Sequence, residues 1–236
     1  MTTRTETITA PDGGTFAAHV RLPESGRGPG LLVLQEIFGV NEYIRDVCRR
    51  LAEAGYVAMA PDVFWRIEPG VECGHDDEGL QQAYGYIGRY DWQAGTADLA
   101  AALAHLRALP ETGGRAGAIG FCMGGTTSFG LACHADPDVV VSYYGSGVPA
   151  MLPDAAGVSM PVLFHFGGDD PYIPREQIHQ VAAYAAGKPN VTCRVWEAGH
   201  AFDNGFAPMF TNPPVAEKAW AETIAWLHQH LPVTEG

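Results

Sequence analysis

The chain has 236 residues, of which 47% are hydrophobic and 17% charged, and its formal net charge is −13. Such a composition is typical of a compact globule and not of a disordered chain. The acidity, with no cluster of Lys and Arg, argues against nucleic acid and anionic membrane surfaces as partners. We expect a single domain over residues 1–236.

Neither a targeting sequence nor a disulfide framework is expected. The first eleven residues are polar and threonine-rich, and no apolar run approaches the length of a membrane span. The five cysteines form no C-x-x-C pair, and their odd number argues against a disulfide framework. These features predict a cytoplasmic protein that is a monomer or a small homo-oligomer.

The N-terminal part is predicted to form an antiparallel hairpin. Segments 5–9 and 16–21 flank Asp12-Gly13-Gly14, a turn signal at the edge of a sheet. Segment 30–35 is a continuous apolar run, as expected of a strand that is covered on both faces.

Strands and helices are then predicted to alternate along the rest of the chain. Asn41 is placed to cap a helix that Gly55 ends, Asp91 is placed to cap a second, long helix, and segment 61–79 has the composition of a surface loop. Further strands are expected at 56–60, 116–119, 138–143, 162–166 and 191–196, and further helices at 126–134, 174–186 and 213–231. This alternation predicts an α/β fold with a doubly wound, mostly parallel sheet.

The stretch Gly120-Phe121-Cys122-Met123-Gly124-Gly125 lies between a predicted strand and a predicted helix. A nucleophile flanked by glycines at such a turn is typical of a nucleophile elbow. A cysteine thiol has a free pKa of about 8.5, and a helix N-terminus with a neighbouring imidazolium favours its thiolate. On this stretch alone, a structural cysteine beside closely packed glycines is an equally good interpretation.

A carboxylate and a histidine follow two later strands. Asp169 and Asp170 lie directly after the strand that ends at Phe166, and His200 lies in a glycine-flanked turn after the strand that ends at Trp196. Carboxyl ends of parallel strands open on the same crevice, so these side chains and Cys122 are expected to meet.

The other histidines suggest no metal site. His165 is expected inside its strand in the core, His75 and His134 in loops or on the surface, and His228 and His230 on different faces of the last helix. Neither a metal nor an organic cofactor is expected.

Several stretches together resemble the dienelactone hydrolase (carboxymethylenebutenolidase) family of the α/β-hydrolase fold, from the first hairpin to the last helix. They are residues 35–41 (QEIFGVN), 120–125 (GFCMGG), 143–145 (YYG), 167–170 (GGDD) and 197–202 (EAGHAF). The resemblance implies that Cys122 is the nucleophile, His200 the base and Asp170 its orienting acid, with Asp169 a solvated turn residue.

Glu36 closes an apolar strand, where an ionised side chain is costly unless it is paired. It can be interpreted as a helix-entry residue that bonds local amides. The resemblance instead implies that Glu36 contacts the resting thiol and helps to activate it. In this architecture the backbone N–H groups of Ile37 and Met123 form the oxyanion hole.

The chain departs from the family at the substrate-binding arginines. Relatives that cleave dienelactone hold its carboxylate with two arginines, and the matching positions here are Leu80 and Asn204. Aromatic residues are abundant near the expected mouth of the site. The candidates for the substrate pocket are Phe38, Leu80, Tyr84, Tyr144, Phe202 and Asn204.

These features predict a cysteine-dependent hydrolase of small neutral esters or lactones that works through a thioester. One alternative is a dienelactone hydrolase proper that uses other cations, with Arg66 and Arg89 as candidates. A second is a non-catalytic thiol sensor, although a sensor needs no full triad. A nucleotide-binding dehydrogenase would need G-x-G-x-x-G after its first strand, and that spacing is not found.

Overall fold

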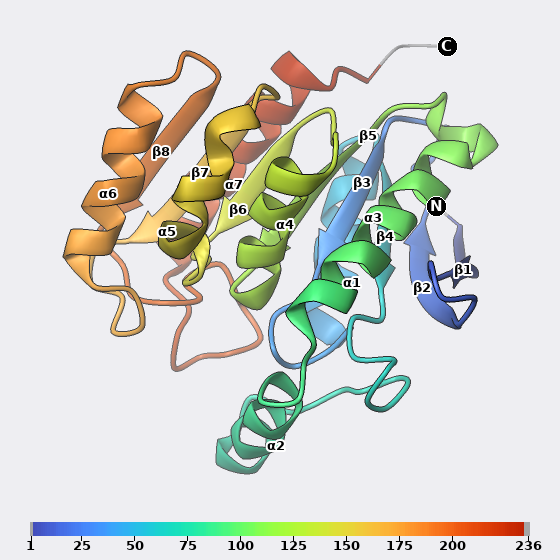
Figure 1. The fold of residues 1–236 in the computed structure, drawn as a ribbon, viewed down its shortest axis with the longest axis horizontal. Helices are drawn as coiled ribbons and strands as arrows, with labels where there is room; N and C mark the ends of the chain where they lie inside the picture. The colour runs from blue at the N-terminus through green and yellow to red at the C-terminus, as the bar shows by residue number, and fades with distance from the viewer. Residues whose placement is uncertain (1, 234–236) are drawn as a thin grey trace.

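The computed structural model describes residues 2–233. It contains an eight-stranded sheet in the order β1-β2-β4-β3-β5-β6-β7-β8 (Figure 1). The strands are β1 (Thr3–Thr9), β2 (Thr15–Arg21), β3 (Gly30–Leu34), β4 (Val57–Pro61), β5 (Ala116–Phe121), β6 (Val140–Tyr143), β7 (Val162–Gly167) and β8 (Val191–Trp196). Strands β1, β2 and β4 pair antiparallel, and all pairs from β4 to β8 are parallel. The predicted fold class, with its N-terminal hairpin, is confirmed.

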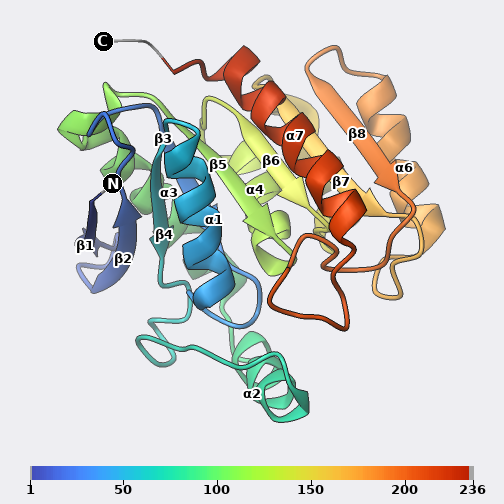
Figure 2. The same cartoon turned by 180° about the vertical axis from the view of Figure 1, so that it is seen from behind.

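Helices cover both faces of the sheet. Helices α3, α4, α5 and α6 lie on the face that Figure 1 presents, and α1 and α7 lie on the opposite face in Figure 2. Their bounds are α1 (Glu42–Glu53), α2 (Asp77–Ile87), α3 (Trp92–Ala108), α4 (Met123–His134), α5 (Val148–Met151), α6 (Arg175–Ala186) and α7 (Pro213–His230), with short 3-10 turns at Pro110–Thr112 and Leu152–Gly157. Strands β3 to β7 are buried throughout, which explains their continuous apolar sequences.

The helix caps follow the local chemistry. The Asn41 side chain accepts a hydrogen bond from the backbone N–H of Ile44 at the start of α1. Asp91 accepts from the N–H groups of Gln93 and Ala94 at the start of α3. Both predicted caps are therefore confirmed.

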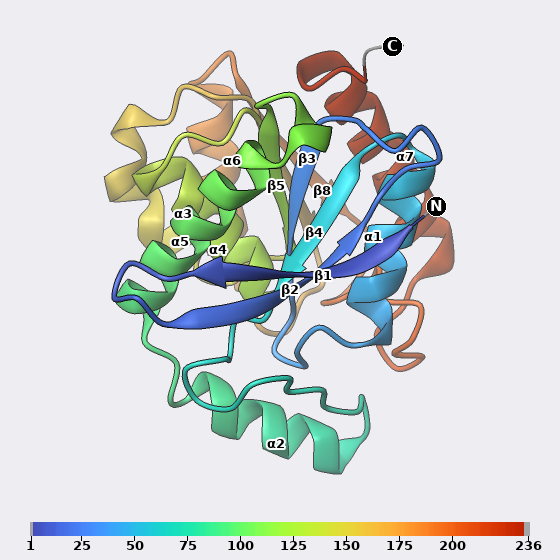
Figure 3. The same ribbon diagram turned by 90° about the vertical axis from the view of Figure 1, so that its right-hand side faces the viewer.

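Helix α2 was not expected. The prediction of a loop over residues 61–79 is wrong at its end, because Asp76 caps a helix that starts at Asp77. Gly79 and Gly85 weaken the helical signal of this segment. Figure 3 shows α2 apart from the sheet, and three of its side chains line the cavity described below.

The register of the central strands brings their carboxyl ends together. Phe121 at the end of β5 lies beside Tyr143 at the end of β6, and Tyr143 lies beside His165 of β7. Gly167, the last residue of β7, pairs with Trp196 at the end of β8. The residues that follow these four strands therefore gather at one edge of the sheet.

Candidate active site

Cys122 occupies a sharp turn between β5 and α4. Its backbone has φ 55° and ψ −113°, which few non-glycine residues adopt. A Cβ on Gly120 would lie 1.9 Å from the Gly124 carbonyl oxygen, and a Cβ on Gly124 would lie 2.0 Å from the Leu34 carbonyl oxygen. The turn therefore requires glycine on both sides of the cysteine, as an elbow does.

Backbone strain is concentrated around this turn. Among the described residues, the non-glycine residues with positive φ are Cys122, Tyr144 at 37° and Ala201 at 51°. Tyr144 follows β6, Ala201 follows His200, and the Tyr144 and His200 rings lie 5.1 Å apart. Such conformations cost of order 1–3 kcal/mol each and cluster at functional sites.

His200 and Asp170 form a buried pair. His200 Nδ1 lies 2.7 Å from Asp170 Oδ2, and Asp170 Oδ1 accepts the backbone N–H of Tyr172 at 2.8 Å. Asp169 instead points outward and pairs with Arg175 on the surface. Only the second of the two neighbouring carboxylates therefore contacts the histidine.

His200 and Cys122 line the same cavity, which is described below. Burial lowers the pKa of His200, but the hydrogen bond to Asp170 and the influence of Cys122 outweigh it and raise this pKa to about 10. The structure thus brings Cys122 and the His200–Asp170 pair together at the carboxyl ends of β5, β7 and β8.

Glu36 is almost fully buried beside these residues. Its Oε2 accepts a hydrogen bond of 2.8 Å from Asn204 Nδ2, whereas Oε1 has no partner among the described residues. Burial raises the pKa of Glu36 to about 7, although the neighbouring His200 and the Asn204 bond act in the opposite direction. A carboxyl with this pKa can hold or release a proton near neutral pH.

A cavity of about 150 Å³ opens on Cys122 and His200. Helix α2 supplies Leu80, Tyr84 and Ile87, which share one helical face at spacings of four and three residues. The remaining lining residues are Glu36, Ile37, Phe38, Ser146, Tyr172, Ala201 and Phe210.

Only some of the predicted pocket residues line this cavity. Phe38, Leu80 and Tyr84 do, whereas Tyr144, Phe202 and Asn204 are fully buried behind it. Ile87, Ser146, Tyr172, Ala201 and Phe210 were not anticipated. The apolar spacing of 80, 84 and 87 is the signal that could have indicated α2 and Ile87.

The cavity lining contains no Lys or Arg. The candidate cations are engaged elsewhere. Arg66 bonds to Asp98 and Asp12. Arg89 bonds to the Gly85 carbonyl, with its guanidinium 5.2 Å from the centre of the Tyr86 ring. The lining offers no guanidinium or ammonium group for a substrate carboxylate, and the imidazole of His200 is already bonded to Asp170.

Ile37 and Met123 carry the backbone amides that are predicted to form the oxyanion hole. Ile37 lines the cavity, and Met123 is the first residue of α4, directly after Cys122. Neither N–H donates to a protein acceptor in the part of the chain that the structure describes. Both are free to donate to a bound oxygen, as an oxyanion hole requires.

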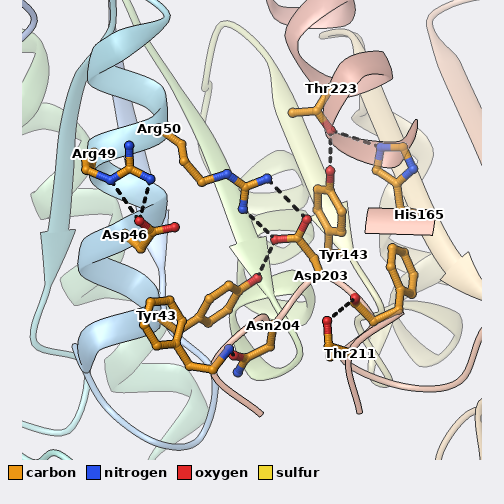
Figure 4. A network of polar contacts seen from close by, with 12 residues as sticks. Tyr43, Asp46, Arg49, Arg50, Tyr143, His165, Asp203, Asn204, Thr211 and Thr223 are labelled. Atoms are coloured by element: carbon orange, nitrogen blue, oxygen red, sulfur yellow. Dashed lines mark hydrogen bonds and ion pairs between the residues drawn. The ribbon is translucent and has the colours of Figure 1, made fainter. Parts of the chain in front are cut away.

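A second buried polar group anchors the loop after His200 (Figure 4). Asp203 accepts from Arg50 at 3.0 Å and from the Tyr43 hydroxyl at 2.8 Å, and the Arg50 guanidinium packs 3.6 Å from the Trp220 ring. The Tyr43 hydroxyl also lies 3.3 Å from that of Tyr144. Helix α1 thus fixes the segment that carries His200 and Asn204.

Within residues 2–233, no three His, Cys, Asp or Glu side chains are arranged to hold a metal ion. In the same range, no helix combines the length and the apolar character that crossing a membrane requires.

Comparison with known proteins agrees with this architecture. The profile described as "Dienelactone hydrolase family" matches residues 16–231. A carboxymethylenebutenolidase of Pseudomonas sp. is 35% identical over 234 residues, which cover 99% of this chain and 98% of that protein.

Solved structures show the same fold. A putative dienelactone hydrolase from Klebsiella pneumoniae subsp. pneumoniae superposes with a TM-score of 0.80 at 26% identity, covering 97% of this chain and 100% of the other. A dienelactone hydrolase-like promiscuous phosphotriesterase from metagenomic libraries gives 0.79 at 26% identity, covering 98% and 99%. With an α/β-hydrolase fold and a family match over nearly its whole length, the chain belongs to the dienelactone hydrolase family of ester and lactone hydrolases.

Proposed function

We propose that the protein hydrolyses small, uncharged esters or lactones through a thioester formed on Cys122. The observation that carries the proposal is the arrangement around the elbow. Cys122 has a strained backbone and lines the cavity, His200 lines the same cavity, and Asp170 bonds to His200 Nδ1 at 2.7 Å. This is the arrangement that an activated nucleophile needs.

The reaction has two acyl-transfer steps. The Cys122 thiolate attacks the carbonyl carbon, and the N–H groups of Ile37 and Met123 stabilise the negative charge on the carbonyl oxygen. The alkoxide leaves with a proton from His200, which gives the thioester. His200 then takes a proton from water, the hydroxide attacks the thioester, and the acid product leaves as the thiol is regenerated.

Glu36 is assigned to the resting state of the thiol. By resemblance to the family, the matching glutamate contacts the thiol and takes part in activating it when substrate arrives. The pKa of Glu36, raised to about 7 by burial, supports this assignment because both protonation states are accessible near neutral pH.

The lining of the cavity supports an uncharged substrate. Its volume of about 150 Å³ and its apolar walls suit a small acyl group, and its lining contains no Lys or Arg. Neutral phosphotriesters are a second candidate class, because one structural relative is a promiscuous phosphotriesterase and such substrates also need no cation.

The test is a panel of neutral and anionic esters and lactones, with one neutral phosphotriester, assayed with wild type and Cys122→Ala. We expect turnover to fall by several orders of magnitude in Cys122→Ala. Cys193→Ala, which changes a half-buried cysteine of β8, is the control and should keep full activity. Full activity of Cys122→Ala would refute the proposal, and failure of the wild type to turn over any substrate would favour a thiol sensor.

The two neighbouring aspartates give a sharper test of the triad. Asp170→Asn and His200→Ala should each lower kcat by a factor of about 10³ or more, because the members of a triad act as a unit. Asp169→Asn removes only a surface pair with Arg175 and should change kcat by less than about twofold. A larger loss in Asp169→Asn would show that the orienting acid has been misassigned.

A further inference from the structure

His75 lies between two amide side chains at the edge of the active site. Its Nε2 is 3.1 Å from Asn204 Nδ2 and 3.4 Å from Asn41 Nδ2. Its ring packs edge-on against Phe38, with centroids 4.6 Å apart. The sequence suggested only a loop or surface residue, but the fold places this half-buried ring beside a residue that lines the cavity.

Backbone N–H groups determine which end of each amide side chain faces His75. Asn41 Oδ1 accepts the N–H of Ile44 at 3.3 Å, and Asn204 Oδ1 accepts the N–H of Phe206 at 3.0 Å. Each amide therefore presents its NH₂ group to the histidine. A ring nitrogen that faces two donors must carry a lone pair, so His75 is the neutral tautomer with its proton on Nδ1. Burial lowers the pKa of His75, which also favours the neutral ring.

The second N–H of Asn204 continues the chain of hydrogen bonds to Glu36. Asn204 Nδ2 donates to Glu36 Oε2 at 2.8 Å. All hydrogen-bonding groups of the Asn204 side chain are thus used, by Phe206, His75 and Glu36. Glu36 Oε1 keeps no partner among residues 2–233.

We infer that His75 is a positioning residue for Glu36. As an acceptor it acts together with the Phe206 N–H, which binds Asn204 Oδ1, to hold the amide where it gives an N–H to Glu36 Oε2, and this leaves Oε1 available to the site of Cys122. The inference rests on the proposed function, because it gives Glu36 a part in the chemistry of the thiol. Without the acceptor, one N–H of Asn204 loses its partner and only Phe206 and Glu36 still hold the amide, so the bond to Glu36 weakens.

The first experiment compares His75→Leu with His75→Gln. Leu removes the acceptor, whereas the side-chain carbonyl of Gln can accept from both amides. We expect His75→Leu to lower kcat by a factor of about 10–100, as for outer groups that orient a functional side chain, with little change in KM. His75→Gln should remain within about threefold of wild type. His19→Leu, which alters a half-buried histidine of β2 away from this site, is the control and should leave both constants unchanged.

The second readout is the pH profile of kcat. Loss of the Asn204 bond should raise the pKa of Glu36, because that bond lowers it. The acid limb of the profile should therefore move up by about one pH unit in His75→Leu and stay in place in His75→Gln. His200, Asp203 and Tyr144 also act on Glu36. These three residues are the same in all variants, so a difference between the pH profiles of the variants reports on the Asn204 bond alone.

Wild-type kcat and an unshifted profile in His75→Leu would overturn the inference. An equal loss in His75→Leu and His75→Gln would do so as well, because the ring and not its acceptor would then matter. If Leu does not fit beside Phe38, as thermal unfolding would show, His75→Ala serves as the non-accepting variant. Failure of the proposed function is recognised separately, as full activity of Cys122→Ala.

Discussion

Two buried carboxylates in this molecule, Glu36 and Asp203, have opposite surroundings. Asp203 is paired with the guanidinium of Arg50 and accepts from Tyr43. Glu36 has one bond from an uncharged amide and one oxygen without a partner. Burial raises the pKa of both, but only for Asp203 does a guanidinium oppose the effect. Asp203 therefore has the surroundings of a structural anchor, whereas the surroundings of Glu36 allow its protonation state to change near neutral pH.

Two histidines show the same contrast. His165 is fully buried between Thr223 and Trp196, which are uncharged partners, and burial lowers its pKa to about 3. His200 is nearly as buried, but Asp170 and Cys122 raise its pKa to about 10. Burial alone keeps an imidazole neutral, and a carboxylate at hydrogen-bonding distance reverses that effect.

The largest effect should come from removing the cation of the structural pair. Arg50→Met leaves Asp203 buried without a counter-charge and should lower the free energy of unfolding by about 3–5 kcal/mol. Its neighbour Arg49 pairs with Asp46 and Glu53 at the surface, so Arg49→Met should cost less than about 1 kcal/mol. Urea unfolding at pH 7 measures both. Equal losses would mean that the buried pair stabilises the fold no more than a surface pair.

A somewhat smaller effect, this time an increase in the free energy of unfolding, is expected when Glu36 is replaced. The folded-state pKa of Glu36 is raised from 4.5 to about 7, so its ionisation opposes folding. This penalty is absent below the unfolded-state pKa, grows as the pH rises between the two values and is complete above the folded-state pKa. Glu36→Gln should therefore raise the free energy of unfolding by up to about 3 kcal/mol at pH 8 and leave it unchanged at pH 4.

In Glu36→Gln we expect kcat to fall although the free energy of unfolding rises, because an amide cannot exchange the proton. Urea unfolding at both pH values, together with kcat on a neutral ester, checks the prediction. The prediction would be contradicted if the difference in free energy of unfolding between Glu36→Gln and wild type were the same at pH 8 and at pH 4. Glu36 would then be a satisfied structural group like Asp203.

The smallest effect concerns a guanidinium group, which pairs with Asp203 but is absent from the cavity lining. Leu80 lies on the face of α2 that lines the cavity, so Leu80→Arg can bring a guanidinium to a substrate carboxylate. We expect the ratio of kcat/KM for an anionic lactone to that for a neutral one to rise by about tenfold, an effect of about 1.4 kcal/mol. Leu80→Met is the uncharged control. Efficient cleavage of dienelactone by the wild type, insensitive to salt, would show that another cation already acts there.

Much of the site could be predicted because its parts follow strands. The glycines around Cys122, the loop with Asp170 and the turn with His200 each come directly after an apolar run. The chain order of a parallel sheet brings such positions to one edge. These local signals indicated Cys122, His200 and the pair Asp169-Asp170 as neighbours, and the resemblance to the dienelactone hydrolase family selected Asp170.

Tertiary structure alone decided what surrounds these residues. Asn204 bonds to Glu36 across 168 positions of sequence and to His75 across 129, and Asp203 bonds to Arg50 across 153. No local pattern encodes such partners, because a hydrogen bond depends on where two distant segments pack and not on their spacing. The sequence by itself determined the strands, the elbow and the carboxyl-end loops through periodicity and glycine. The partners of Glu36 and Asp203, the contribution of Ile87 to the cavity and the orientation of His75 arose only when the folded chain removed these groups from water and left them to bond with each other.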